Sequence, residues 1–406
     1  MSPARLRGDL EEGDVSARAD RRARGAHTVA ALIALVAGGA GGACGDDGLD
    51  DTGDFAWELP RGFPVPAVPR DNPMSVAKVE LGRHLFYDRR LSINNTMSCA
   101  SCHLPEQAFA DGKRVPEGAT GTLLLRNSPG LQNVAYLSTY TWGNPVLETL
   151  EQQVVVPLFG DNPIELGTGE DLAGILARLA ADPVYPALFS EAFPGQVEPI
   201  SRAAIIYAVA SFTRSMISGD SPYDRYAYGK DSAALSDSAK RGMELFFSER
   251  AECYHCHSGV NLTNAFRARD SASIERVFEN NGLYNVGNAG TYPANNPGLY
   301  EFTGKPEDHG KFRVPPLRNL SFTAPYMHDG SVATLEELVD MYARGGRRIT
   351  EGPLAGDGAL NPHKSSLVRG FNLSAQDRAD LLAWLRSLDD PGFGANPRFA
   401  DPWVAR

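Results

Sequence analysis

The sequence contains two short cysteine–histidine motifs, CASCH at residues 99–103 and CYHCH at residues 253–257. The chain has five cysteines, and all but one lie in these motifs, as Cys99, Cys102, Cys253 and Cys256. Two disulfides would use the four thiols but leave both histidines unexplained. A zinc site of four thiolates would need no histidine after each pair.

Covalent haem attachment accounts for both cysteines and the histidine of a Cys-x-x-Cys-His motif. Each thiol adds to a vinyl group, and the following histidine binds the iron. The two motifs therefore predict two c-type haems, with His103 and His257 as the proximal iron ligands. His255 lies inside the second motif, and we expect it to be an exposed spacer.

The approaches to the two motifs are similar, which suggests an internal duplication. LGRHLFYDRRLSINNTMSCASCH at 81–103 and RGMELFFSERAECYHCH at 241–257 share Gly-x-x-Leu-Phe before the cysteines. The apolar spacing predicts helices at 200–216 and 374–388, and alternating strand patterns are scarce. Ser374 and Asp377 predict a capping box at the start of the second of these helices.

The predicted fold is mainly α, with two cytochrome c-like haem domains and long loops rich in Pro and Gly. The predicted domains are residues 61–225, which would carry the peroxide-reactive haem, and residues 226–406, which would carry the electron-transfer haem. The stretch SGDSPYDRYAYGKDS at 218–232 is the predicted connection between them.

Residues 1–44 are predicted to be an export signal. Arginines precede an uncharged run at 28–43, which is too short for a membrane span but typical of a signal core. Cys44 follows small residues, as in a lipoprotein attachment site; the alternative is an ordinary cleaved signal. Residues 45–60 are predicted to form an acidic flexible tether. The export signal places the protein in the periplasm, and a lipid on Cys44 would attach it to the membrane.

The predicted mature chain is strongly acidic. Without the six arginines and five acidic residues of residues 1–44, 33 basic and 45 acidic side chains remain, a net charge of −12. Such a surface repels nucleic acid and favours neutral or basic partners.

The first haem has few candidates for a sixth iron ligand. No histidine lies between His103 and His255, and Met216 and Met243 are the only methionines in that interval. Met243 belongs to the approach to the second motif, and Met216 has the pattern of a core residue. His84 lies on the approach helix and is expected to be a partly exposed helix residue. We therefore expect an open iron above His103, at which peroxide can bind.

The segment TLEELVDMYARGG at 334–346 predicts a helix near the second haem. Thr334 and Glu337 predict a capping box, and Gly345 a helix end. The i, i+3, i+4, i+7 pattern places Tyr342 on the buried stripe and Met341 off it. Tyr342 is therefore the better placed to reach a buried iron, although an ordinary core tyrosine has the same pattern.

Several longer segments resemble the bacterial di-haem cytochrome c peroxidases and their relative MauG, over roughly residues 75–390. They are LGRHLFYDRRLS at 81–92, RNSPGLQN at 126–133, LEQQVVVP at 150–157 and VPPLRNLSFTAPYMHDGSVATLEELVDMYARGG at 314–346. WGNPVLETLEQQVVVPLFGDNPIELG at 142–167 looks most like the MbnH branch, whose members are encoded beside a copper-binding protein.

The resemblance implies further ligands. The second haem has a distal Met in the peroxidases and a distal Tyr in MauG and MbnH, and Tyr342 stands at that position. A calcium ion between the haems is implied at an Asn side chain and two backbone carbonyls, which match Asn127, Thr323 and Pro325. Such oxygen ligands suit a hard cation.

The resemblance also implies catalytic positions. The Trp between the haems matches Trp142, and His328 matches a His between the haem domains. The residues of the distal pocket match Gln153, Pro157 and Glu165. Glu165 is then the general acid/base for peroxide cleavage, with Gln153 orienting peroxide or water.

The function implied is that of a hydrogen-peroxide-dependent di-haem oxidoreductase of the MauG/MbnH type. Its high-valent di-haem state would oxidise an exported partner protein, at a Trp, and the partner could be a copper-binding MbnP-like protein. MauG passes oxidising equivalents out through a Trp two residues before the second motif, where this chain has Ala251. Other aromatic residues could serve instead: Tyr254, Trp57, Trp384 and Trp403.

Two other functions remain open on the sequence. One is a cytochrome c peroxidase that takes electrons from a small cytochrome or cupredoxin, which Tyr342 in place of Met disfavours. The other is a non-catalytic di-haem electron carrier, which the missing His ligand after His103 disfavours.

Overall fold

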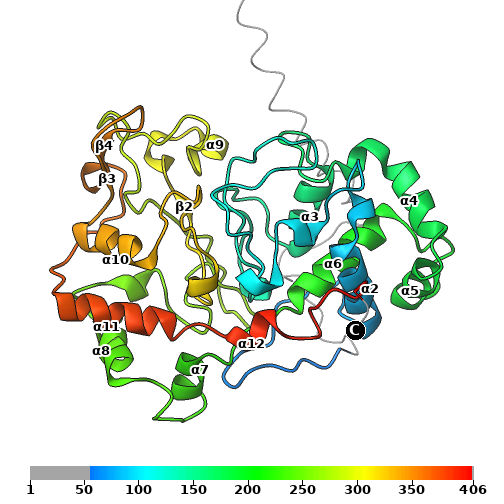
Figure 1. Cartoon of the computed structure of the whole chain (residues 1–406), viewed down its shortest axis with the longest axis horizontal. Helices are drawn as coiled ribbons and strands as arrows, with labels where there is room; N and C mark the ends of the chain where they lie inside the picture. Colours follow the sequence, from blue (N-terminus) through cyan, green and yellow to red (C-terminus); the bar gives the residue numbers. More distant parts are fainter. Residues whose placement is uncertain (1–54, 405–406) are drawn as a thin grey trace, which may run out of the picture. The chain divides into compact units, whose positions relative to one another are not determined.

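Two pairs of helices pack beside the two cysteine motifs. The structure is a computed structural model that describes residues 55–404, so the predicted signal, Cys44 and most of the acidic tether lie outside the described residues. Helix α2 (Val76–Tyr87) packs against α6 (Arg202–Arg214), and α8 (Asp237–Phe246) packs against α11 (Ala375–Arg386) (Figure 1). The fold is mainly α-helical, as predicted.

Short helices and irregular segments complete the described chain. The remaining α-helices are α3 (Leu150–Phe159), α4 (Leu172–Ala180), α5 (Tyr185–Ala192), α7 (Pro222–Ala227), α9 (Tyr300–Thr303), α10 (Leu335–Arg344) and α12 (Pro391–Gly394). Two antiparallel ladders are present, β1 (Phe278–Glu279) with β2 (Phe312–Arg313) and β3 (Arg348–Ile349) with β4 (Gly356–Asp357).

The glycine shared by the two approach segments has the same role in both helix pairs. A Cβ on Gly82 of α2 would lie 1.9 Å from the backbone oxygen of Ala208 in α6. A Cβ on Gly242 of α8 would lie 1.9 Å from the backbone oxygen of Asp380 in α11. Both crossings are therefore too close for any side chain, and this shared geometry supports the duplication read from the sequence.

The phenylalanine of each shared Gly-x-x-Leu-Phe segment is also equivalent. The ring of Phe86 lies 5.3 Å from the ring of Phe212, while Phe246 lies 4.1 Å from Trp384. Each phenylalanine ring is also 6.4 Å from the histidine of its own motif. The two helix pairs thus place an apolar wall beside each motif histidine.

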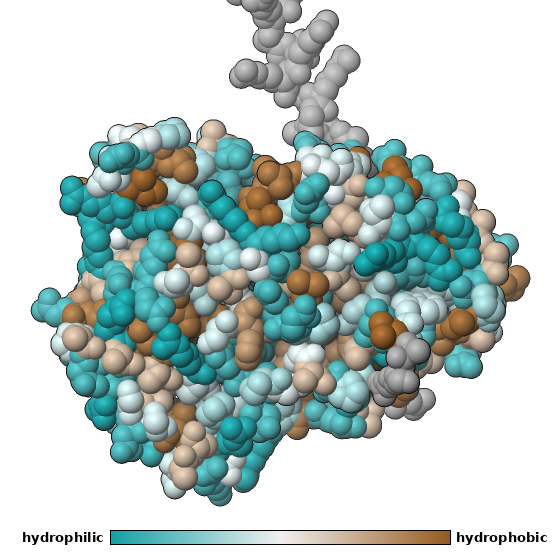
Figure 2. Space-filling view, in the orientation of Figure 1, coloured by the Kyte–Doolittle hydropathy of each residue, from teal (hydrophilic) through white to brown (hydrophobic). Residues whose placement is uncertain are grey.

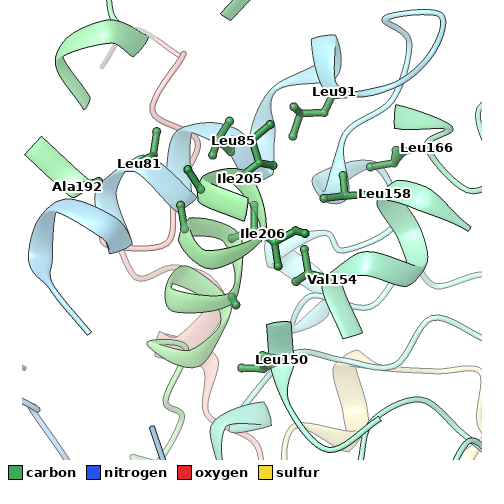
Figure 3. Packing of buried hydrophobic residues seen from close by; sticks show 14 of the residues in the cluster. Leu81, Leu85, Leu91, Leu150, Val154, Leu158, Leu166, Ala192, Ile205 and Ile206 are labelled. Carbon is green, nitrogen blue, oxygen red and sulfur yellow. The ribbon is translucent and has the colours of Figure 1, made fainter. Parts of the chain in front are cut away.

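Separate clusters of buried side chains surround the two helix pairs. In the first, Leu81 and Leu85 of α2 pack with Ile205 and Ile206 of α6 and with Val154 of α3 (Figure 3). The second is built on α8, α10 and α11.

The end of the chain returns to the first helix pair. Phe393 of α12 and Phe399 pack with Phe109 and Phe212, so the last residues complete the core beside the first motif. The division into two domains at residue 225 stays a prediction, because the described residues 55–404 belong to one compact unit.

The predicted helix ends agree with the structure, with one local difference. Ser374 and Asp377 form the expected capping box of α11. In α10, Thr334 accepts from the Glu337 amide as predicted, but the Glu337 carboxylate accepts from Ala333, one residue earlier. Gly345 ends α10 at a φ of +81°, as expected.

The expectation that Met341 points away from the buried side of α10 was wrong. Met341 is only 5% exposed. The chain turns back after α10, and Met341, Gly346 and Ile349 line the same pocket. Helical periodicity could not predict this, because the covering segment comes from outside the helix.

Within residues 55–404, no single helix has the length and apolar composition to cross a membrane. One helix pair, Thr168–Ala180 with Tyr185–Ala192, passes on length and composition but is bent by 100°.

Candidate active site

The cysteines of both motifs lie in short 3-10 turns, Cys99–Ser101 and Cys253–His255. All four are free thiols, so no disulfide joins them. Burial raises the pKa of Cys102 and of Cys256 to about 11, which keeps both sulfurs protonated. Free thiols are the groups from which thioether bonds to haem are made, so the four sulfurs are available for haem attachment.

Each motif histidine is oriented through one ring nitrogen. Nδ1 of His103 lies 2.7 Å from the backbone oxygen of Phe109, and Nδ1 of His257 lies 3.1 Å from that of Leu262. A carbonyl accepts only from a protonated nitrogen, so Nδ1 carries the proton and Nε2 keeps its lone pair. Desolvation lowers the pKa of both rings, that of His257 to about 4. Two neutral imidazoles with a free Nε2 fit proximal iron ligands.

The other candidate ligands near the first motif have different partners. Met216 is fully buried with Phe86 and Phe109, which lie on the His103 side of the motif. His84 places Nδ1 2.9 Å from the Glu80 backbone oxygen and its ring 4.9 Å from Trp403. Both side chains therefore have a structural explanation.

The sequence-predicted distal residues come together on α3 and the loop after it. Gln153 and Pro157 are four residues apart, on one face of α3. The Pro157 carbonyl accepts from the Leu166 amide at 3.0 Å, and the Glu165 carbonyl accepts from the Ala119 amide at 2.7 Å. The first bond holds the Glu165 loop against the helix, and the second joins the loop to the segment of Ala119.

Two of these side chains have the properties of a pocket lining. The Oε1 atom of Gln153 is buried without a hydrogen-bond partner among the described residues. Desolvation raises the pKa of Glu165 to about 7. Its charge in turn acts on the thiols of Cys99 and Cys102, so the carboxyl group lies near the first motif. The arrangement provides a proton-exchanging group and an unpaired polar atom beside that motif.

Tyr342 lies near the second motif. Desolvation raises its pKa to about 12, and the charges of Cys256 and Cys253 act on it in the same direction. The side-chain amide of Asn281 donates to the phenol oxygen at 3.2 Å. The Oδ1 atom of Asn281 accepts from the Leu283 amide at 3.2 Å, which fixes the amide so that its NH₂ group faces Tyr342.

Asn281 is a site residue that the sequence did not indicate. It follows Asn280 and precedes Gly282, a composition that reads as an ordinary turn. Its NH₂ group also lies 3.3 Å from the Met327 sulfur. No periodic pattern or motif connects a turn residue to a phenol sixty-one positions later.

Trp142, Asn127 and His328 are joined through the backbone of Asn127. The indole nitrogen of Trp142 donates to the Asn127 carbonyl at 2.8 Å, and the Asn127 amide donates to the His328 carbonyl at 2.9 Å. The His328 ring stacks on Phe312 at 3.6 Å, and desolvation lowers its pKa to about 4. Its buried Nε2 has no partner among the described residues.

The candidate calcium residues lie on neighbouring segments. The side-chain amide of Asn127 donates to the Lys113 carbonyl at 2.8 Å, so its Oδ1 atom points elsewhere. The bond from the Asn127 amide to the His328 carbonyl joins Asn127 to the segment that follows Thr323 and Pro325 along the chain. Oxygen donors on adjacent segments fit a hard cation.

The aromatic residues considered as exits differ in exposure. Trp384 is fully buried against Phe246, and Trp57 is partly buried against Phe55. Trp403 is 39% exposed, but it packs on His84, away from the second motif.

Tyr254 is next to a motif cysteine and partly exposed. Its hydroxyl group donates to the Glu249 carboxylate, and its ring lies 4.1 Å from His255.

The family model for di-haem cytochrome c peroxidase matches residues 76–232. A cytochrome-c peroxidase, IdrP1, of Pseudomonas sp. (strain SCT) is 38% identical over 80% of this chain and 84% of its own length. The methylamine utilization protein MauG of Methylorubrum extorquens is 34% identical over 79% of this chain and 80% of its own length.

A solved structure is more similar still. The crystal structure of a MauG-like protein associated with microbial copper homeostasis is 51% identical, with a TM-score of 0.84. The match covers 86% of this chain and all of that one. The di-haem cytochrome c peroxidase family implies two c-type haems and hydrogen peroxide as the oxidant, which agrees with the two motifs and the oriented histidines. The chain therefore belongs to the family of di-haem cytochrome c peroxidases and MauG, and it is a peroxide-dependent oxidoreductase.

Proposed function

We propose that this enzyme uses hydrogen peroxide to oxidise an exported partner protein at a tryptophan, as in the MauG and MbnH branch. The haems would be attached through Cys99 and Cys102 and through Cys253 and Cys256, and His103 and His257 would bind their irons. When bound, they supply the iron chemistry that cleaves peroxide and the capacity to hold its two oxidising equivalents.

The observation that carries the proposal is the environment of Tyr342. Its phenol oxygen accepts a hydrogen bond from Asn281, and no acceptor for the phenol proton is found among the described residues. This hydrogen bond lowers the pKa of Tyr342 and so offsets part of the desolvation that raises it, which makes the phenolate easier to form than burial alone would allow. A phenolate oxygen is a harder ligand than the thioether of a methionine and favours more oxidised iron.

Glu165 is the group that moves the peroxide proton. With a pKa of about 7 it exchanges protons near neutral pH, which is the condition for efficient general acid/base catalysis. The carboxylate takes the proton from one peroxide oxygen and returns it to the other, which leaves as water. Gln153 orients the peroxide through its unpaired oxygen, and Pro157 shapes the pocket wall and holds the loop of Glu165.

Trp142 is proposed to connect the two haems electronically. It is 9% exposed and hydrogen-bonded at both its indole and its carbonyl, so its orientation is fixed. His328 lies beside it through Asn127, and a calcium ion held by Asn127, Thr323 and Pro325 would fix the same segments. The calcium ion is part of the proposal.

The partner is expected to be an exported protein with a neutral or basic docking face. The predicted mature chain has a net charge of −12. On the face drawn in Figure 2, hydrophobic residues form small patches separated by hydrophilic ones, which favours polar docking there. The similarity to a MauG-like protein associated with copper homeostasis supports a copper-binding protein as the substrate. The expected location is the periplasm, with lipid attachment at Cys44.

Tyr254 is the proposed exit for oxidising equivalents, in place of the Trp that MauG has where this chain has Ala251. A tyrosine can give up an electron readily only when its proton has an acceptor, and the Glu249 carboxylate is that acceptor. The residue is part of the second motif, so few atoms separate it from the haem.

A second candidate function is reduction of peroxide with electrons from a small cytochrome or cupredoxin. The 38% identity to a cytochrome-c peroxidase favours it. The two functions differ in the fate of the donor, which is modified permanently in the first case and merely oxidised in the second.

The test is incubation of the purified holoenzyme with peroxide and the copper-binding protein encoded nearest to its gene, followed by mass spectrometry of that protein. Peroxide-dependent oxygen incorporation at a tryptophan, absent with Tyr342→Met, supports the proposal. An unmodified protein, with rapid oxidation of a reduced small cytochrome, would support the peroxidase instead.

A further inference from the structure

Arg313 is a buried cation without a carboxylate partner among the described residues. Three arginines have exposures of 3% or less, namely Arg214, Arg313 and Arg318. Arg214 pairs with Glu151 at 2.6 Å, and Arg318 pairs with Asp224 at 2.7 Å. Arg313 differs from both, since its contacts are with backbone carbonyls.

The backbone contacts of Arg313 leave most of its hydrogen-bonding capacity unused. Nε donates to the Thr141 carbonyl at 2.9 Å, and Nη1 donates weakly to its neighbour Val314 at 3.5 Å. Desolvation lowers the pKa of Arg313 to about 10. An unpaired charge in such a place is costly, so a stable holoenzyme needs an anion beside it.

A second arginine lies in the same region. The Nε atom of Arg267 is buried and has no partner among the described residues. The charges of Arg267 and Arg313 both act on the buried phenol of Tyr140. The Tyr140 hydroxyl donates to the Val134 carbonyl at 3.2 Å, so it does not neutralise either cation.

Both arginines belong to segments that pass the second motif. Arg313 precedes Val314, whose carbonyl accepts from the Thr263 hydroxyl at 2.7 Å. Pro315 follows, and its backbone lies near the ring of His257, whose pKa it raises. Arg267 lies ten positions after His257 along the chain.

We propose that Arg313 and Arg267 bind the propionate carboxylates of the haem attached at Cys253 and Cys256. The propionates are the anionic part of a haem and are not used in its covalent attachment. A guanidinium group matches a carboxylate with two parallel hydrogen bonds and remains charged when buried. This inference rests on the proposed attachment of that haem. The two arginines would hold the haem edge and stabilise its reduced iron.

The test uses the purified di-haem protein and its Arg313→Gln variant. Intact mass and peptide mapping first establish that both motifs carry haem. Spectroelectrochemical titration then gives the reduction potential of each haem. Loss of a cation disfavours the reduced haem, which carries more negative charge. The redox equilibrium of the second haem should therefore shift about tenfold toward the oxidised form, which is a decrease of about 59 mV in its reduction potential. Arg313→Lys keeps the charge and should shift less.

Arg267→Gln is a second variant. It should disturb the fold less than Arg313→Gln, because Arg267 is only partly buried. The propionate bending modes in its resonance Raman spectrum should move, because one carboxylate loses its partner. Arg378→Gln removes a surface ion pair with Asp340 and should leave both potentials unchanged.

Unchanged potentials and unchanged propionate modes in fully haem-loaded Arg313→Gln and Arg267→Gln proteins would overturn the inference. A shift confined to the haem at Cys99 and Cys102 would also overturn it. Wild-type protein without haem at Cys253 and Cys256 would instead refute the proposed attachment on which the inference rests.

Discussion

The indole nitrogen of Trp142 donates a hydrogen bond of 2.8 Å to the backbone carbonyl of Asn127. The carbonyl of Trp142 in turn accepts from the Arg313 amide at 2.8 Å. The Asn127 carbonyl thus orients the indole ring, and strand β2 holds the backbone of the same residue. A ring fixed in this way can couple two redox centres without reorganising.

Replacement of Trp142 by Phe should uncouple the haems while leaving each in place. The variant loses the donor to Asn127 and the larger ring, but both motifs are untouched. After one equivalent of peroxide, the near-infrared band that reports charge shared between the haems should be lost. Trp403→Phe is the control, because Trp403 packs on His84 instead. An unchanged band in Trp142→Phe would contradict the assigned role.

Asn281→Leu should weaken the bond between Tyr342 and iron. The substitution removes the donor to the phenol oxygen, and a hydrogen bond to a charged group contributes about 1.5–3 kcal/mol. The ligand equilibrium should therefore fall by roughly tenfold or more. Tyrosinate modes in the resonance Raman spectrum of the ferric protein measure this directly. Asn372→Leu, at an exposed position before α11, is the control. Full tyrosinate intensity in Asn281→Leu would show that Asn281 is dispensable.

The reaction with peroxide should depend on the ionisation of Glu165. Its pKa is raised to about 7 by burial, so the carboxylate that accepts the proton is populated above that value. The rate constant should rise with pH through about 7 and then level off. Glu165→Gln should lower the plateau by roughly 10²–10⁴-fold and abolish this pH dependence. Stopped-flow absorption measures both, and a Gln variant with the wild-type profile would exclude Glu165 as the base.

The same shift has a consequence for stability. Burial holds the proton of Glu165 more tightly in the folded chain than in the unfolded chain, where the ordinary pKa is 4.5. The contribution of Glu165 to the free energy of unfolding should therefore decrease as pH rises from about 4.5 to about 7. Glu165→Gln should be relatively more stable than wild type at pH 8 than at pH 4. Denaturant titrations at the two pH values test this.

Alanine at Gly82 or at Gly242 should destabilise the fold. Each Cβ would lie 1.9 Å from a backbone oxygen, so the paired helices must move apart, which typically costs about 1–3 kcal/mol. Gly169→Ala is a control, because its Cβ would meet Phe159 at 3.5 Å, an ordinary contact. Chemical denaturation followed by far-UV circular dichroism gives the difference. Equal stability of the three variants would mean that the crossings are looser than the structure shows.

Tyr254→Phe should slow the oxidation of an external donor without changing the reaction with peroxide. Phenylalanine keeps the ring but cannot lose a proton to Glu249. Formation of the oxidised enzyme should be unchanged, whereas its decay in the presence of a basic ferrocytochrome c should slow by at least tenfold. Freeze-quench EPR of the wild type should show a tyrosyl radical that Tyr254→Phe lacks. Identical decay and an identical radical in both proteins would place the exit elsewhere.

The sequence predicted those parts of the site that depend on local chemistry. The motif spacing indicated haem because both cysteines and the histidine of Cys-x-x-Cys-His have a chemical role, and the orientation of His103 and His257 agrees. The Gly-x-x-Leu-Phe repeat indicated duplication, and Gly82 and Gly242 have the same function in their helix pairs. Capping residues indicated the ends of α10 and α11 because their hydrogen bonds are local.

The sequence could not predict features created by distant segments. Asn281 reaches Tyr342 through a turn, and no periodicity encodes that contact. Met341 is buried by the chain after α10, and Phe393 and Phe399 complete a core that begins three hundred residues earlier. The missing counter-charge of Arg313 also becomes visible only when all neighbours are known.

The central claim concerns the state that forms when peroxide oxidises this enzyme. With Tyr342 at the second haem, the two haems share the oxidising equivalents, which are then transferred to a protein. The most direct measurement is the near-infrared spectrum of the ferric protein after one equivalent of hydrogen peroxide, with Tyr342→Met beside it. The account predicts a charge-resonance band in the wild type and none in the variant. No band in the wild type, with rapid turnover on a reduced cytochrome, would contradict the account and identify a conventional peroxidase.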